Sequence, residues 1–190
     1  ALKTTTGGDG QAFFANHTGS TGDIAIFQSG STNVARIDKT GKGFFNNGTQ
    51  LGGADLAESF AVEGESSLYE PGDVLVISTK TDRTIEKSSV AYSSLVAGVY
   101  ATKPGVLLTE NHIDTDLSAE VPMGVVGVIP TKVCNEGGKI QRGDLLVSSS
   151  KSGYAMKADP DKLKFGQVLG KALENFEGEE GKIKVLVNVK

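Results

Sequence analysis

The sequence predicts an all-β protein, in which a glycine-rich, intertwined trimeric β shaft precedes a β-barrel or sandwich-like knob. Short apolar runs alternate with turn residues along the chain, a Gly-Asp strand motif occurs twice, and no long stretch has the periodicity of an amphipathic helix. Composition changes after position 53: residues 1–53 hold eleven glycines, seven charged residues and no proline, whereas residues 54–190 hold all five prolines. We therefore expect two domains, a shaft (1–53) and a knob that directs trimerisation (54–190).

In the shaft, strands are expected where apolar residues lie between turn-forming Gly, Asn, Ser and Thr. The expected strands are Gln11–Ala15, Asp23–Gln28, Asn33–Asp38 and Gly43–Asn46. The run from Thr40 to Gly43 predicts a tight turn, because glycine adopts positive φ without a Cβ clash.

The shaft lacks the apolar residues for a core of its own. Its large ones are nearly all in one short set: Phe13, Phe14, Ile24, Ile26, Phe27, Val34, Ile37, Phe44 and Phe45. Isolated two-stranded ribbons are marginal in water, and exposed strand edges pair with other chains. Three copies around a shared axis would supply the missing core, so we expect a homotrimer. The alternative is that the ribbon packs on the downstream domain of its own chain.

The knob contains an internal repeat. Pro71-Gly-Asp-Val-Leu-Val-Ile-Ser78 matches Arg142-Gly-Asp-Leu-Leu-Val-Ser-Ser149. In each copy Gly-Asp predicts a turn, which the Asp side chain can cap, and the apolar residues that follow predict a buried strand. Further strands are expected at 95–100, 124–133, 168–173 and 181–189. Several short strands with regular turn signals favour a barrel or sandwich.

Bulk properties exclude several classes of function. The net charge is −4 and no Lys/Arg block exists, so nucleic-acid binding is not expected, since it needs a positive surface. No apolar run approaches the ~20 residues of a membrane helix, so no membrane insertion is expected. Cys134 is the single cysteine, and His17 and His112 are far apart. We therefore expect no metal site, and with no phosphate-binding glycine motif we expect no cofactor.

The best candidate for chemistry follows two glycines at the start of the knob. Asp55 and Glu58 lie three residues apart in Gly52-Gly-Ala-Asp-Leu-Ala-Glu-Ser-Phe60. Two carboxyl groups near one peptide bond can act as acid and base when their environments separate their pKa values. The competing interpretation is a strand start or short turn with two solvated acids.

Three segments carry a resemblance to a known group of proteins: Gly53–Phe60, Glu70–Ile77 and Val96–Tyr100. They resemble the C-terminal domains of phage tail fibres and tailspikes, and most of all the G2 peptidase, or intramolecular-chaperone autocleavage, family. Members typically open with a sequence like Gly-Ala-Asp-Tyr-Ala-Glu-Tyr-Phe. The upstream stretch Asn33–Gln50 is similar to the trimeric shaft that precedes such domains.

The resemblance implies a trimeric β fold whose C-terminal domain brings three chains into register. In cleaving members this domain is then cut from the shaft just before the Asp. Carried over to this chain, the scissile bond is Ala54–Asp55, and Asp55 and Glu58 are the reacting carboxyl groups. Leu56 and Ser59 replace the aromatic residues typical at those two places.

The resulting expectation is a structural and assembly protein rather than an enzyme. It would be the distal part of a trimeric tail-fibre-like appendage on an extracellular particle, such as a virion tail or injection-system fibre, or on a cell surface. One alternative is a self-cleaving intramolecular chaperone. Another is a fibre tip that binds a host-surface receptor or glycan, with Tyr69, Tyr92, Tyr100 and Tyr154 lining a groove between subunits.

Overall fold

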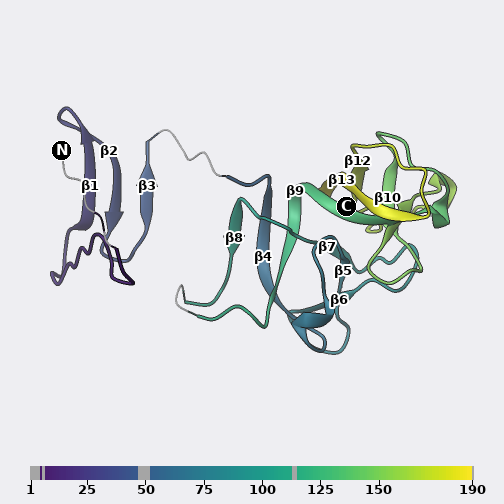
Figure 1. The fold of residues 1–190 in the computed structure, drawn as a ribbon, viewed down its shortest axis with the longest axis horizontal. Coiled ribbons are helices and arrows are strands. Elements are labelled where there is room, and N and C mark those ends of the chain that lie inside the picture. Colours follow the sequence, from purple (N-terminus) through teal and green to yellow (C-terminus); the bar gives the residue numbers. More distant parts are fainter. Residues whose placement is uncertain (1–4, 6, 47–51, 113–114, 190) are drawn as a thin grey trace. The chain divides into compact units, whose positions relative to one another are not determined.

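The structure, a computed structural model, describes residues 5, 7–46, 52–112 and 115–189 (Figure 1). These residues form thirteen strands in two sheets and three single-turn 3₁₀-helices, so the all-β prediction is confirmed. The chain divides into two compact units, Ala1–Gln50 and Leu51–Lys190.

The first unit is a three-stranded antiparallel sheet of β1 (Asp23–Ser29), β2 (Thr32–Asp38) and β3 (Gly43–Phe45) in sequential order. The predicted turn between β2 and β3 is confirmed. Gly41 has φ +85° there, and its N–H donates to the Asp38 carbonyl at 3.0 Å. The Asp38 carboxylate accepts the Thr40 hydroxyl and the Thr40 and Lys42 amides, which lowers its pKa.

The strand expected at Gln11–Ala15 is wrong, because these residues form an irregular segment that pairs with no strand. Phe13 and Phe14 remain 66% and 78% exposed. Two adjacent phenylalanines point to opposite sides of an extended chain, so without a partner strand neither side is covered. No side chain of the described residues 7–46 is buried.

The second unit holds the other ten strands. They are β4 (Asp55–Val62), β5 (Val74–Ile77), β6 (Thr84–Lys87), β7 (Val96–Tyr100), β8 (Val106–Leu108), β9 (Val121–Cys134), β10 (Leu145–Ser148), β11 (Ala155–Lys157), β12 (Gly170–Ala172) and β13 (Glu180–Asn188). The 3₁₀-helices are Ser66–Leu68, Asn135–Gly137 and Pro160–Lys162. None of the helices in the described residues is long and apolar enough to cross a membrane.

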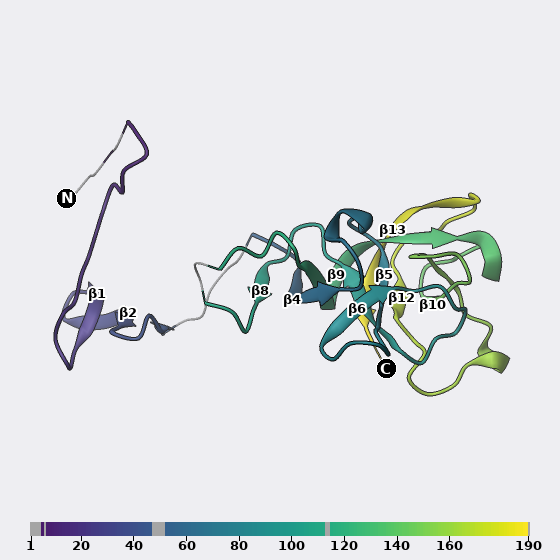
Figure 2. The same cartoon turned by 90° about the horizontal axis from the view of Figure 1, so that it is seen from below.

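Two closed rings of strands share β9. The first ring runs β9–β7–β5–β6–β4 and back to β9; the second runs β9–β13–β12–β10–β11 and back to β9. Figures 1 and 2 show β9 leaving its place beside β4 and continuing alongside β13. Strand β8 lies outside both rings and pairs in parallel with β4. This closure explains the barrel-like knob, because a closed ring has no free edges.

The predicted Gly-Asp repeat is a repeat of structure as well as of sequence. The Asp73 carboxylate accepts the Glu70 N–H at 2.9 Å, and the Asp144 carboxylate accepts the Gln141 N–H at 2.7 Å. Each acid therefore caps its own turn through the side chain, as predicted.

The paired glycines also make matching bonds. Gly72 donates its N–H to the Tyr100 carbonyl at 2.9 Å, and Gly143 donates to the Ala172 carbonyl at 2.8 Å. Both have positive φ, +98° and +91°. The first bond ties the turn to the end of β7, and the second ties it to the end of β12, so the two turns have equivalent places in the two rings.

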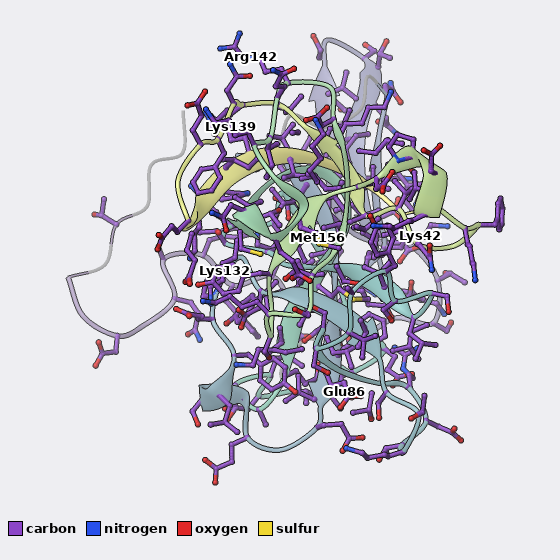
Figure 3. The ribbon with its side chains drawn as sticks, turned by 90° about the vertical axis from the view of Figure 1, so that its right-hand side faces the viewer. Lys42, Glu86, Lys132, Lys139, Arg142 and Met156 are labelled. Carbon is purple, nitrogen blue, oxygen red and sulfur yellow. The ribbon has the colours of Figure 1, made fainter. Side chains whose placement is uncertain are left out.

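Both rings are filled by aliphatic side chains. The larger cluster centres on the second ring and includes Ile129, Leu146 and Val185, each 0% exposed. A smaller cluster around Leu75, Ile85 and Val121 fills the first ring. In Figure 3 the Met156 side chain lies among the strands, whereas Arg142 projects outward from its turn.

Candidate functional site

The two candidate carboxyl groups belong to β4, whose N-terminal half is held on both sides. Along one edge β4 runs antiparallel to β9, pairing Asp55 with Gly127, and along the other it runs parallel to β8, pairing Leu56 with Val106. The side chains alternate along β4, so Ala57 and Ser59 are buried while Leu56 is 37% exposed. The expectation of a strand start for this motif is confirmed.

The Asp55 side chain is half-buried in apolar surroundings. Its Oδ2 atom is buried, and no hydrogen-bond partner for it is found among the described residues. A Cβ added to Gly124 would lie 3.3 Å from this oxygen, 2.2 Å from Ile129 Cδ1 and 3.5 Å from Ala101 Cβ. Because burial disfavours the charged form, the pKa of Asp55 is raised above its usual value.

The Ala54–Asp55 peptide bond is held by backbone contacts. The Ala54 carbonyl accepts the Val128 N–H at 3.2 Å, and the Asp55 carbonyl accepts the Gly105 N–H at 2.8 Å. Gly127, at φ +133°, packs so closely that an added Cβ would lie 2.5 Å from the Ala54 oxygen. Glycine is required there both for the left-handed backbone and for the close approach.

An open hollow of ≈ 610 Å³ adjoins this bond. Its lining includes both residues of the bond and two lysines, Lys103 and Lys184. The bond that the sequence singles out therefore lies beside an open hollow that carries two cations.

Glu58 faces the other side of β4, since residues three apart on a strand point to opposite faces. Its carboxylate accepts a hydrogen bond from Arg83 Nη2 at 2.8 Å, and Arg83 Nε donates to Glu110 at 2.7 Å. The guanidinium also lies 5.5 Å from the centre of the Phe60 ring. Within one chain, the structure thus does not bring Asp55 and Glu58 together.

A buried ion pair that the sequence reading missed joins the two rings. Lys132 Nζ on β9 lies 2.6 Å from Asp73 Oδ1, and these side chains are 9% and 1% exposed. Lys132 also pairs with Glu70. Burial pulls the pKa of Lys132 down, but the two carboxylates outweigh it, so its pKa is raised. The signal was present in the repeat, because a turn-capping Asp has a second oxygen available for a cation.

The four tyrosines do not form an exposed platform within one chain. Tyr69 and Tyr100 belong to the cluster that fills the first ring, and Tyr92 and Tyr154 pack against the cluster around Met156. The Tyr69 hydroxyl donates to the Glu63 carbonyl at 2.8 Å. Within one chain they therefore pack against the apolar clusters, and a groove between subunits stays a prediction.

Arg83, Lys103, Lys184 and Gly127 also escaped the sequence reading. Arg83 lies in the turn before β6, Lys103 in the loop between β7 and β8, Lys184 in β13 and Gly127 in β9. All four are far from residue 55 in sequence, so no local motif marks them. Among the described residues, no group of three or more His, Cys, Asp and Glu side chains could hold a metal ion.

Comparisons with known proteins add one likeness of fold. No protein-family model matches the chain. No curated protein sequence matches it either. The fold is similar to that of pre-mature bacteriophage phi29 gene product 12, with a TM-score of 0.58 and 15% identity over 82% of this chain. The match covers 24% of the phage protein, so this chain spans about a quarter of that protein's length. At this identity the comparison shows a shared fold.

Proposed function

We propose that this chain is the distal part of a trimeric tail-fibre-like appendage of a phage or phage-derived injection system. Residues before β4 form a shaft shared between copies, and the two-ring unit is a knob that sets the register of three chains. The likeness of fold to a bacteriophage phi29 protein supports the phage origin. Such a part would be exposed on an extracellular particle.

The observation that carries the proposal is the sheet of β1, β2 and β3, in which no described side chain is buried. A unit of this size cannot offset its conformational entropy without a core. Identical copies supply apolar surface in register. The closed knob that follows in the chain would hold three copies together.

Light scattering on the intact protein tests this function. We expect a mass of three times 19.8 kDa under native conditions and one chain under denaturing conditions. A well-folded monomer at micromolar concentration would contradict the proposal.

A second candidate function is self-cleavage at Ala54–Asp55, which the raised pKa of Asp55 favours. In this hydrolysis water adds to the Ala54 carbonyl carbon, the C–N bond breaks, and the leaving nitrogen takes a proton. In this proposal a protonated Asp55 carboxyl group donates it. Glu58 faces away within one chain, so the reaction also needs an arrangement that brings a carboxylate base to the bond. In this proposal the intact chain is the form before cleavage.

Intact mass measured over days after purification separates the two functions. Cleavage predicts two fragments, 1–54 and 55–190, whose masses together exceed the full chain by one water. Asp55→Asn should abolish them, and Asp116→Asn is a matched control, because Asp116 is exposed and caps Ser118. A single unchanged mass would remove the self-cleavage candidate and leave the structural role intact.

A further inference from the structure

The two faces of the sheet in the first unit differ in the charges that they carry. Strand register places Phe27 opposite Ala35, and Ala35 opposite Phe45; the next row joins Ala25 to Ile37. Because residues paired across strands share a face, one face is made of apolar residues. We call it the apolar face: Ala25, Phe27, Ala35, Ile37 and Phe45.

The opposite face also holds an exposed apolar residue, Ile26 at 52%, but it carries charges that are satisfied within the chain. The Arg36 guanidinium stacks 3.6 Å from the centre of the Phe44 ring and pairs with Asp23 at 2.8 Å. Lys42 lies 5.0 Å from the same ring. A partner covering this face would have to desolvate these cations, which is costly, so this face is suited to solvent.

Within residues 7–46, the apolar face is uncovered. Phe27 and Phe45 are 54% and 55% exposed. Figures 1 and 2 show no second layer over the sheet within residues 7–46. Large apolar residues that adjoin one another on a sheet mark a contact surface, because their exposure in water is unfavourable.

Small units are stabilised by disulfides, metal ions or oligomerisation. An intrachain disulfide is excluded because Cys134 is the only cysteine, and the described residues hold no metal-binding cluster. Oligomerisation is the means that the proposed function supplies. A second copy offers a face with the same apolar residues and no charge to desolvate, so the apolar face is complementary to itself.

We propose that the apolar face is the contact surface between copies of this chain, with Phe27 and Phe45 directed inward and Arg36 and Phe44 left at the solvent side. This inference rests on the proposed function, and it adds which face of the sheet makes the contact. It predicts opposite outcomes for adjacent residues of one strand.

The test compares Phe45→Asn with Phe44→Asn in the full chain by sedimentation equilibrium. Each variant should keep the thermal transition of the knob. Phe45→Asn should weaken association at least tenfold, because it removes a buried phenylalanine from every copy, and Phe27→Asn should do the same. Phe44→Asn should change association less than threefold.

The outcomes separate two claims: that the chain is a trimer, and that the apolar face makes the contact. A monomeric wild-type protein would overturn both claims. The alternative would then be that the apolar face contacts the knob of its own chain. A wild-type trimer that Phe45→Asn leaves unchanged, or that Phe44→Asn dissociates equally, would overturn only the face assignment.

Crosslinking gives a second measurement that does not depend on lost stability. In a Cys134→Ser background, Phe45→Cys should form covalent dimers of the full chain with a short bis-maleimide. Phe44→Cys should remain uncrosslinked under the same conditions. Equal crosslinking at the two positions would contradict the proposal.

Discussion

The open sheet of residues 23–45 and the two rings of residues 55–188 are built from similar short strands, yet only the rings have a core. In the rings, Val99, Ile129 and Leu146 are fully buried. In the sheet, Phe27 and Phe45 are more than half exposed. The difference lies in closure: a strand forms from local signals, but it buries side chains only when a second layer faces it. The knob supplies that layer to itself, and we propose that other copies of the chain supply it to the sheet.

The strongest way to break this comparison is to separate the units. We expect residues 51–190 alone to unfold cooperatively, with a midpoint independent of protein concentration. Residues 1–50 alone should be unfolded as a monomer at micromolar concentration, because no core offsets roughly 1–2 kcal/mol of backbone entropy per residue. Circular dichroism and sedimentation would check both. A folded monomeric 1–50 fragment would contradict the comparison.

A cavity in the second ring should cause the next largest loss, in the stability of the knob. Leu146→Ala removes a fully buried side chain and should cost about 2–5 kcal/mol in the free energy of unfolding of the knob. Urea denaturation of the full chain measures this cost. Leu68→Ala is the matched control, since Leu68 is 61% exposed and should change stability by less than about 0.5 kcal/mol.

Breaking the ion pair between the rings should have a somewhat smaller effect. Lys132→Met leaves Asp73 buried without its cation and should cost about 3 kcal/mol. The double variant Lys132→Met/Asp73→Ser, which keeps an oxygen to cap the turn, should recover part of this loss. If the single and double variants were equally unstable in urea, the pair would not be what joins the rings.

A pH-dependent effect sharpens the description of the first ring. The folded-state pKa of Asp55 is raised by burial, so wild-type stability falls as pH rises through that pKa. Asp55→Asn lacks this titration, so near neutral pH it should be more stable than wild type by roughly 0.5 kcal/mol. The difference should shrink below the unfolded pKa of aspartate.

The control for this titration is Asp116→Asn, which should behave with the opposite sign. The Ser118 amide and hydroxyl lower the pKa of Asp116, so wild-type stability from this group is present at neutral pH and lost in acid. Chemical denaturation at several pH values compares the two variants. The same pH profile for both would contradict the role of burial at Asp55.

The smallest effect is expected at the surface of the first ring. Arg83 bridges Glu58 and Glu110, but its side chain is 46% exposed. Arg83→Ala should therefore change the free energy of unfolding only slightly. The change should decrease further at high salt, because ions screen exposed pairs. A loss as large as that of Lys132→Met, and one that salt does not reduce, would show a structural role for this bridge.

A short motif in the sequence predicted the residues of the candidate site, but it did not predict how their side chains are arranged. Residues Gly53–Phe60 pointed to Asp55, whose pKa is perturbed and whose preceding peptide bond adjoins the hollow. The same motif suggested Glu58 as a partner. Strand alternation separates the two residues once β4 is known to be regular, but a turn after Gly52 and Gly53 was an equally good local reading.

The sequence by itself determined the all-β class, the turns at Gly41, Gly72 and Gly143, the repeat, and the shortage of large apolar residues before β4. Turn chemistry and side-chain alternation are local properties, so they can be read from adjacent residues. Only the tertiary structure decided that β9 belongs to two rings, that β8 pairs in parallel with β4, and that Lys132 meets Asp73. These features join residues tens of positions apart, and register between distant strands depends on which side chains fill the shared interior.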